Sequence, residues 1–171
     1  MTTEHKVFIG TGLATVLIII GGIFLVSKQD ERLSKSLLGQ EVKVEGRNHV
    51  PDGTEIIYNS SAPAAGPHYA TTAHAGIYDK APADGNIVHS LEHGAVILWY
   101  KADLSKNDVE KLKKIFNQTS GKGIMTPRKN LDAPIALTSW GRILKLQKID
   151  EKQIKNFFET NRDRAPEQAP I

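Results

Sequence analysis

Four histidines lie close together in the middle of the chain, and they are the most informative chemical feature of the sequence. They are His68, His74, His89 and His93. The last two belong to the stretch HSLEHG, which also carries Glu92. Imidazole nitrogens bind zinc and copper(II), and a carboxylate can join them as a further ligand.

The spacing of His89 and His93 decides whether the two rings can share an ion. On a helix, residues four apart lie about 6 Å from each other. On a strand, four residues span about 13 Å, which is too far for one metal. The metal hypothesis therefore requires residues 89–93 to be helical, and Gly94 allows the chain to change direction before the next strand.

We predict from this pattern a site for one divalent ion, zinc or copper(II). Its expected ligands are His68, His89, His93, Glu92 and, as a further candidate, His74. Glu92 could bind the ion directly, or it could orient a histidine ring and fix its tautomer.

Two other interpretations of the cluster stay open. Ser90, Glu92 and the imidazoles could form a satisfied hydrogen-bond network, and the protein would then be a non-enzymatic structural or interaction module. Alternatively, Glu92 could be the base that activates a metal-bound water, which would make the protein a metal-dependent hydrolase. HSLEH lacks the glutamate placement of the zinc-protease motif H-E-x-x-H, so the sequence leaves enzymatic activity open.

Composition excludes several other kinds of site. The chain has no cysteine, which rules out disulfides, thiolate zinc sites and cysteine nucleophiles. Its two methionines argue against a soft copper(I) site. The net charge is only +3, and no basic stripe is interleaved with aromatic residues, so we expect no nucleic-acid partner.

The N-terminal part has the composition of a membrane anchor. Residues 7–26 contain no charge and no proline. Twenty helical residues span roughly 30 Å, the thickness of the hydrocarbon core of a bilayer. The run is long for a signal peptide, and no A-x-A-like cleavage site follows it. We therefore predict a single-pass transmembrane helix at residues 7–26, between a short tail (1–6) and a juxtamembrane linker (27–39).

The remaining residues predict an α+β domain over residues 40–163, followed by a proline-rich tail at 164–171. Helices are expected after Ser105 and Asp150, which are placed as N-caps before apolar stripes. Residues 59–86 are rich in turn-forming residues and predict a long loop. Strands are expected in the segments EVKVEGRNHV, TEIIYN, GAVILWYK, GIMTPR, PIALTSW and RILKLQ. The order favours a mostly antiparallel sheet with the two helices on one face.

The motifs in this order resemble those of a known family. APAAGPHY is similar to the family pattern P-P-T-S-G-P-H-Y, and GIYD, VHSLEHGAVILWY, IALTSWGR and the closing APE match in sequence order. On these motifs the chain resembles the DUF3105 family of small bacterial and archaeal proteins over roughly residues 40–167. Members often carry one N-terminal membrane helix.

The resemblance implies a location but no activity, because the family is a domain of unknown function. The matched motifs carry His68, His89, Glu92 and His93, whereas His74 is not clearly part of one. The basic residues that flank the apolar segment favour a cytoplasmic domain by a small margin. The resemblance implies instead a domain on the outer side of the cytoplasmic membrane, and we follow that expectation.

Overall fold

The structure is a computed structural model that describes residues 3–119, 121–167 and 169–171, with side chains from residue 11 onward. The chain divides into two compact units, Met1–Ser36 and Leu37–Ile171.

In the part that the structure describes, the first unit contains one helix, α1 (Thr3–Ser34). Its segment Thr11–Ser34, 24 residues, is long and apolar enough to cross a membrane. At 1.5 Å per residue this segment is about 36 Å long. The predicted span, residues 7–26, lies within α1, while residues 1–2 of the predicted tail fall outside the described residues.

The second unit contains eight strands and three helices in its described part. They are β1 (Gln40–Glu41), β2 (His49–Val50), β3 (His68–Tyr69), β4 (Gly76–Ile77), α2 (Asp84–Glu92), β5 (Val96–Lys101), α3 (Lys106–Phe116), β6 (Gly123–Arg128), β7 (Ile135–Ser139), β8 (Arg142–Leu146) and α4 (Glu151–Asn161).

Six strands form one mixed sheet in the order β1-β8-β7-β5-β6-β4, and β2 pairs with β3 separately. The pairs β1–β8, β8–β7 and β7–β5 are antiparallel. The pairs β5–β6 and β6–β4 are parallel. The predicted α+β class with a mostly antiparallel sheet is therefore confirmed, and α3 is the crossover that makes β5 and β6 parallel.

Helices α3 and α4 begin where their capping residues predict. The Ser105 side chain accepts a hydrogen bond from the Asp108 amide, and the Asp150 side chain accepts one from the Gln153 amide. Each bond satisfies an amide that a helix start leaves without an intrahelical partner.

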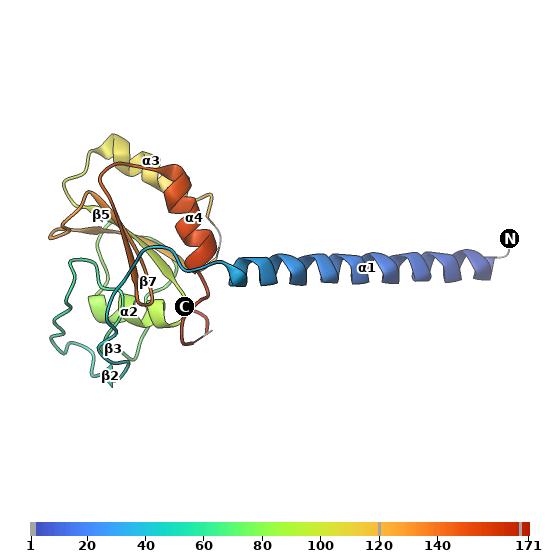
Figure 1. Cartoon of the computed structure of the whole chain (residues 1–171), viewed down its shortest axis with the longest axis horizontal. Helices are drawn as coiled ribbons and strands as arrows, with labels where there is room; N and C mark the ends of the chain where they lie inside the picture. Colours follow the sequence, from blue (N-terminus) through green and yellow to red (C-terminus); the bar gives the residue numbers. More distant parts are fainter. Residues whose placement is uncertain (1–2, 120, 168) are drawn as a thin grey trace. The chain divides into compact units, whose positions relative to one another are not determined.

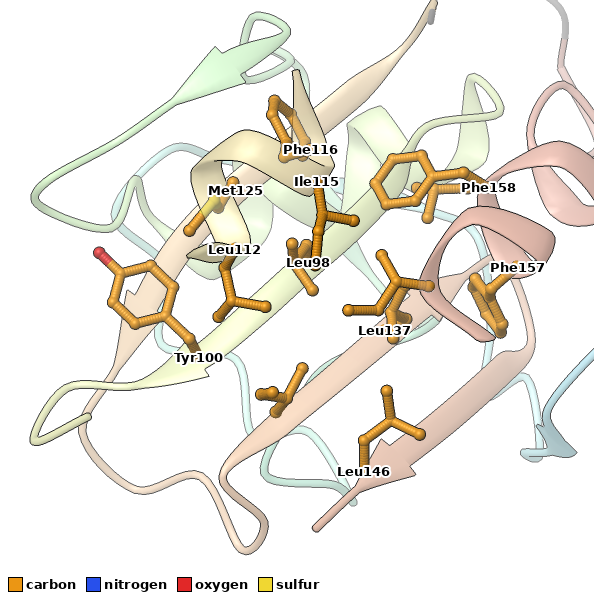
Figure 2. Packing of buried hydrophobic residues seen from close by; sticks show 13 residues of the cluster. Leu98, Tyr100, Leu112, Ile115, Phe116, Met125, Leu137, Leu146, Phe157 and Phe158 are labelled. Atoms are coloured by element: carbon orange, nitrogen blue, oxygen red, sulfur yellow. The ribbon is translucent and has the colours of Figure 1, made fainter. Parts of the chain in front are cut away.

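The two helices pack together on one face of the sheet (Figure 1). Their apolar side chains, among them Leu112, Phe157 and Phe158, meet Leu98 and Leu137 of the central strands (Figure 2). Among the described residues, this face holds one of two hydrophobic clusters, as expected for helices on one face.

Helix α2 covers the opposite face of the sheet and was not predicted as a helix over its full length (Figure 1). Its residues Ile87, Val88 and Leu91 are fully buried, in a cluster with Ile97 and Trp99 of β5. The predicted strand at residues 54–59 is wrong, because this segment has no regular structure and its Ile57 is 87% exposed.

The start of the second unit is fastened to its last helix. The Asn161 side chain accepts a hydrogen bond from the Leu38 amide and donates one to the Leu38 carbonyl, both at 2.9 Å. The same amide group donates to Ser139 Oγ in β7. Asn161 therefore joins the first residues of the unit, the sheet and α4.

Candidate metal centre

Helix α2 places His89 and Glu92 on the candidate site. The helix includes the stretch from His89 to Glu92, so the curl that the metal hypothesis requires is present. The helix ends at Glu92, and Gly94, two residues further on, has a φ of 89°, in the left-handed region that glycine favours. A β-carbon on residue 94 would lie 2.8 Å from the Asp163 Cα, so the close approach of these two backbone segments also requires glycine.

The short sheet of β2 and β3 brings His49 beside His68. The two histidines are direct partners in a parallel pair, and neighbouring strands lie about 4.8 Å apart. Their ring centroids are 5.0 Å apart. His49 thus enters the site through backbone pairing between two-residue strands.

Hydrogen bonds from α2 hold the loop that precedes it in place. Ser90 Oγ donates to the Ala73 carbonyl at 2.8 Å and accepts from the Ala73 amide at 2.9 Å. Asn86 Nδ2 donates to the Thr71 carbonyl. Ser90 is therefore an architectural residue, as one of the two alternative interpretations expected for this serine.

Four side chains form a group that could hold a metal ion. They are His49, His68, His89 and Glu92, and each offers one ligand atom within 4.8 Å of all the others. In a tetrahedral zinc site with bonds of 2.0–2.1 Å, the ligand atoms are about 3.4 Å apart. The group needs only a contraction of an ångström or so to surround one ion. His68, His89 and Glu92 are buried, while His49 is exposed.

Two imidazole nitrogens in this group are buried without a hydrogen-bond partner among the described residues: His68 Nε2 and His89 Nδ1. His68 Nδ1 lies 2.9 Å from the Gly66 carbonyl, which can only accept, so Nδ1 carries the proton. In the neutral ring Nε2 then presents a lone pair, and it lies 3.0 Å from Glu92 Oε2. A lone pair facing a carboxylate is repulsive unless a cation or a proton lies between them.

His89 is held in its neutral form. Burial, followed by the nearby His93, His68 and His49, lowers the pKa of His89 to about 4, against an opposing hydrogen bond with the Tyr69 backbone. A neutral imidazole is the form that binds metals. At neutral pH this ring therefore has a lone pair available.

Glu92 faces two positive or potentially positive groups. Its Oε2 lies near His68, and its Oε1 lies 3.8 Å from Arg47 Nε. The Glu92 side chain is 3% exposed, whereas that of Arg47 is 55% exposed. A buried carboxylate needs such compensation, and a solvated arginine on one side supplies only part of it.

The two remaining predicted ligands lie outside the four-residue group. The His93 ring is 4.4 Å from that of His89, but its nitrogens face the C-terminal segment. Nδ1 lies 3.0 Å from the Pro170 carbonyl and Nε2 lies 3.3 Å from Glu167 Oε2. His74 is exposed on the loop after β3. The structure thus brings together His68, His89 and Glu92 and adds His49, which the sequence reasoning missed.

Fold and site define an α+β domain with a buried group of three histidines and one glutamate that could hold a metal ion. A family model described as "Protein of unknown function (DUF3105)" matches residues 49–170. The chain therefore belongs to the DUF3105 family, as its motifs predicted. No match was found among curated proteins or among solved structures.

Proposed function

We propose that this protein is a membrane-anchored domain that binds one divalent ion, zinc or copper(II). The ligands would be His49, His68, His89 and Glu92. The observation that carries the proposal is His89 Nδ1, a buried nitrogen without a hydrogen-bond partner among the described residues, beside His68 Nε2, whose neutral ring would turn a lone pair toward Glu92 Oε2 at 3.0 Å. A purely architectural network would satisfy His89 Nδ1, since a buried polar group without a partner costs about 1–3 kcal/mol.

The donor set suits a borderline ion. Three imidazoles and one carboxylate match the preferences of zinc and copper(II), and an ion bound there would polarise any water or ligand reaching it. His68 is oriented by its bond to the Gly66 carbonyl, and Glu92 by Arg47. His49 is the exposed member, so it would complete the site from the solvent side.

The anchor is the other part of the proposal. Helix α1 would span the bilayer once, with the uncharged residues 7–26 as the membrane-spanning segment. We place the domain outside the cytoplasmic membrane. Protease treatment of intact spheroplasts should then digest the domain, and digestion only after lysis would contradict the placement.

Metal analysis of the full chain, purified in detergent and freed of any histidine tag, tests the site. Wild type and the control His74→Ala should each hold about one ion per chain. The double variant His49→Ala with His89→Ala should hold none while keeping its circular dichroism. A copper(II) ion would add a visible absorption band and an electron paramagnetic resonance signal, which zinc lacks.

The variant His93→Ala separates the two versions of the ligand set. If His49 is a ligand, His93→Ala keeps the ion and His49→Ala loses or weakens it. The reverse result would show that His93, and not His49, is the fourth metal ligand. A metal-free wild type that is well folded would support the architectural interpretation instead.

A further inference from the structure

A second candidate site lies at the other end of β5. A cavity of about 880 Å³ is bounded by residues at the carboxyl ends of three strands that run in one direction, β4, β5 and β6. Asp79 and Lys80 follow β4, Tyr100 lies near the end of β5, and Arg128 ends β6. Loops diverging from the carboxyl ends of parallel strands are where open sheets bind ligands.

Helix α3 and the turn before it provide the facing wall. Leu104 and Val109 line the cavity from this side, opposite Pro127 of β6. The volume lies in the range of pockets that bind small organic molecules, and such pockets combine apolar walls with a few polar groups. The cavity could therefore enclose an apolar body.

The charge of the lining is positive. Five basic and two acidic side chains line the cavity. Lys113 is paired with Glu110 at 3.0 Å, and Arg128 with Asp84 at 2.6 Å. Lys80, Lys106 and Lys129 form no ion pair with any residue that the structure describes, and they lie exposed around the cavity. An anionic group would be the complementary ligand.

Tyr100 offers a hydrogen-bond donor to the cavity. The residue is only 6% exposed, and its ring belongs to the cluster under α3. Figure 2 shows its hydroxyl directed away from the other labelled side chains of that cluster. Within the described residues no hydrogen bond is found for the hydroxyl, and it is not one of the buried side-chain atoms without a partner. It is therefore open to the cavity, where a ligand can accept its hydrogen bond in place of water.

This cavity is separate from the candidate metal centre. None of the four histidine and glutamate residues of that centre lines it. His93 directly precedes the turn into β5, whereas Tyr100 lies close to its far end. Five or six extended residues span roughly 20 Å.

We propose that this cavity binds a small organic anion with an apolar body, such as an aromatic carboxylate or phosphate monoester. Its anionic head would lie among Lys80, Lys106 and Lys129 and accept a hydrogen bond from the Tyr100 hydroxyl. Its apolar body would pack between Leu104 and Val109 on one side and Pro127 on the other.

Phenyl phosphate is the probe, measured by isothermal titration calorimetry on the full chain in detergent. Wild type should bind it at least about tenfold more tightly than neutral benzyl alcohol or inorganic phosphate, because each lacks one half of the recognised chemistry. Lys106→Ala with Lys129→Ala should weaken binding by about tenfold or more, and Tyr100→Phe by about threefold to tenfold. The control Lys152→Ala, an exposed lysine outside the cavity, should leave binding unchanged.

Three results would overturn the proposal: no binding of phenyl phosphate, equal binding of inorganic phosphate, or equal affinity of the lysine double variant and wild type. The variant His89→Ala should retain binding. If His89→Ala no longer bound phenyl phosphate, the probe would occupy the metal centre instead of the cavity.

Discussion

The substitution Glu92→Gln discriminates between the metal and architectural interpretations, because it removes a charge while keeping shape. If Glu92 is a metal ligand, the change should weaken zinc binding by about tenfold to a hundredfold, as for other changes around metal sites. Bound metal stabilises the folded state by mass action, by about 4.1 kcal/mol when the free concentration is 1,000 times the Kd. The variant should therefore lose about 1.4–2.7 kcal/mol of this stabilisation.

Thermal unfolding with and without buffered zinc measures the difference. For a domain of this size, 1 kcal/mol shifts the Tm by about 4 °C. Zinc at that concentration should thus raise the Tm of wild type by about 16 °C, and that of Glu92→Gln by roughly 5–11 °C less. His74→Ala should behave like wild type, because His74 is exposed and lies outside the group.

Under the architectural interpretation, the stability loss of Glu92→Gln should not depend on zinc. Breaking a buried ion pair between Glu92 and His68 would destabilise the protein by about 3–5 kcal/mol whether or not zinc is present. A Tm deficit of Glu92→Gln that is the same in zinc and in chelator, with no zinc response in wild type, would refute the metal reasoning.

Three further predictions concern the supports of the site and the fold. Ser90→Ala should destabilise the protein by about 1–3 kcal/mol in urea unfolding, because it leaves the carbonyl of buried Ala73 without its partner, while the Ala73 amide keeps its 3.1 Å bond to the Asn86 carbonyl; an unchanged midpoint would contradict this role. Asp150→Ala should cost about 1 kcal/mol in the same assay by removing the cap of α4, and Asp150→Asn should restore most of it. In chelator-treated protein, nuclear magnetic resonance should show His89 titrating near pH 4. Because its pKa is lowered on folding, the unfolded chain binds the proton first, so its contribution to stability is lost as the pH falls from about 6.5 to about 4; a titration near 6.5 would contradict its burial.

Local signals in the sequence predicted much of the fold. The caps at Ser105 and Asp150 and the apolar stripes behind them mark α3 and α4 correctly, because a cap is a contact between residues three apart. The start of α2 carries no such signal. Its N-cap is Ala83, which makes no side-chain hydrogen bond. Asp84 in its first turn is held instead by Arg128, 44 residues away.

The candidate site was also predictable only in part, because some of its contacts join residues far apart in the sequence. His89 and Glu92 share a helical turn, so their proximity follows from spacing once the helix is assumed. His49 joins them through β2 and β3, two strands of two residues each that lie 19 positions apart in the chain. No periodicity can be read from such short strands. The nearer His93 was therefore the natural prediction for the position that His49 occupies.

The double hydrogen bond between Leu38 and Asn161 has a mechanical consequence. Because the entry of the domain is fastened to α4, and β1 immediately after it to β8, a pull exerted through the N-terminal segment loads these contacts first. The tension would be shared between the last helix and one edge of the sheet. The histidine cluster lies further along the chain and would keep its geometry until these hydrogen bonds and the β1–β8 pairing broke.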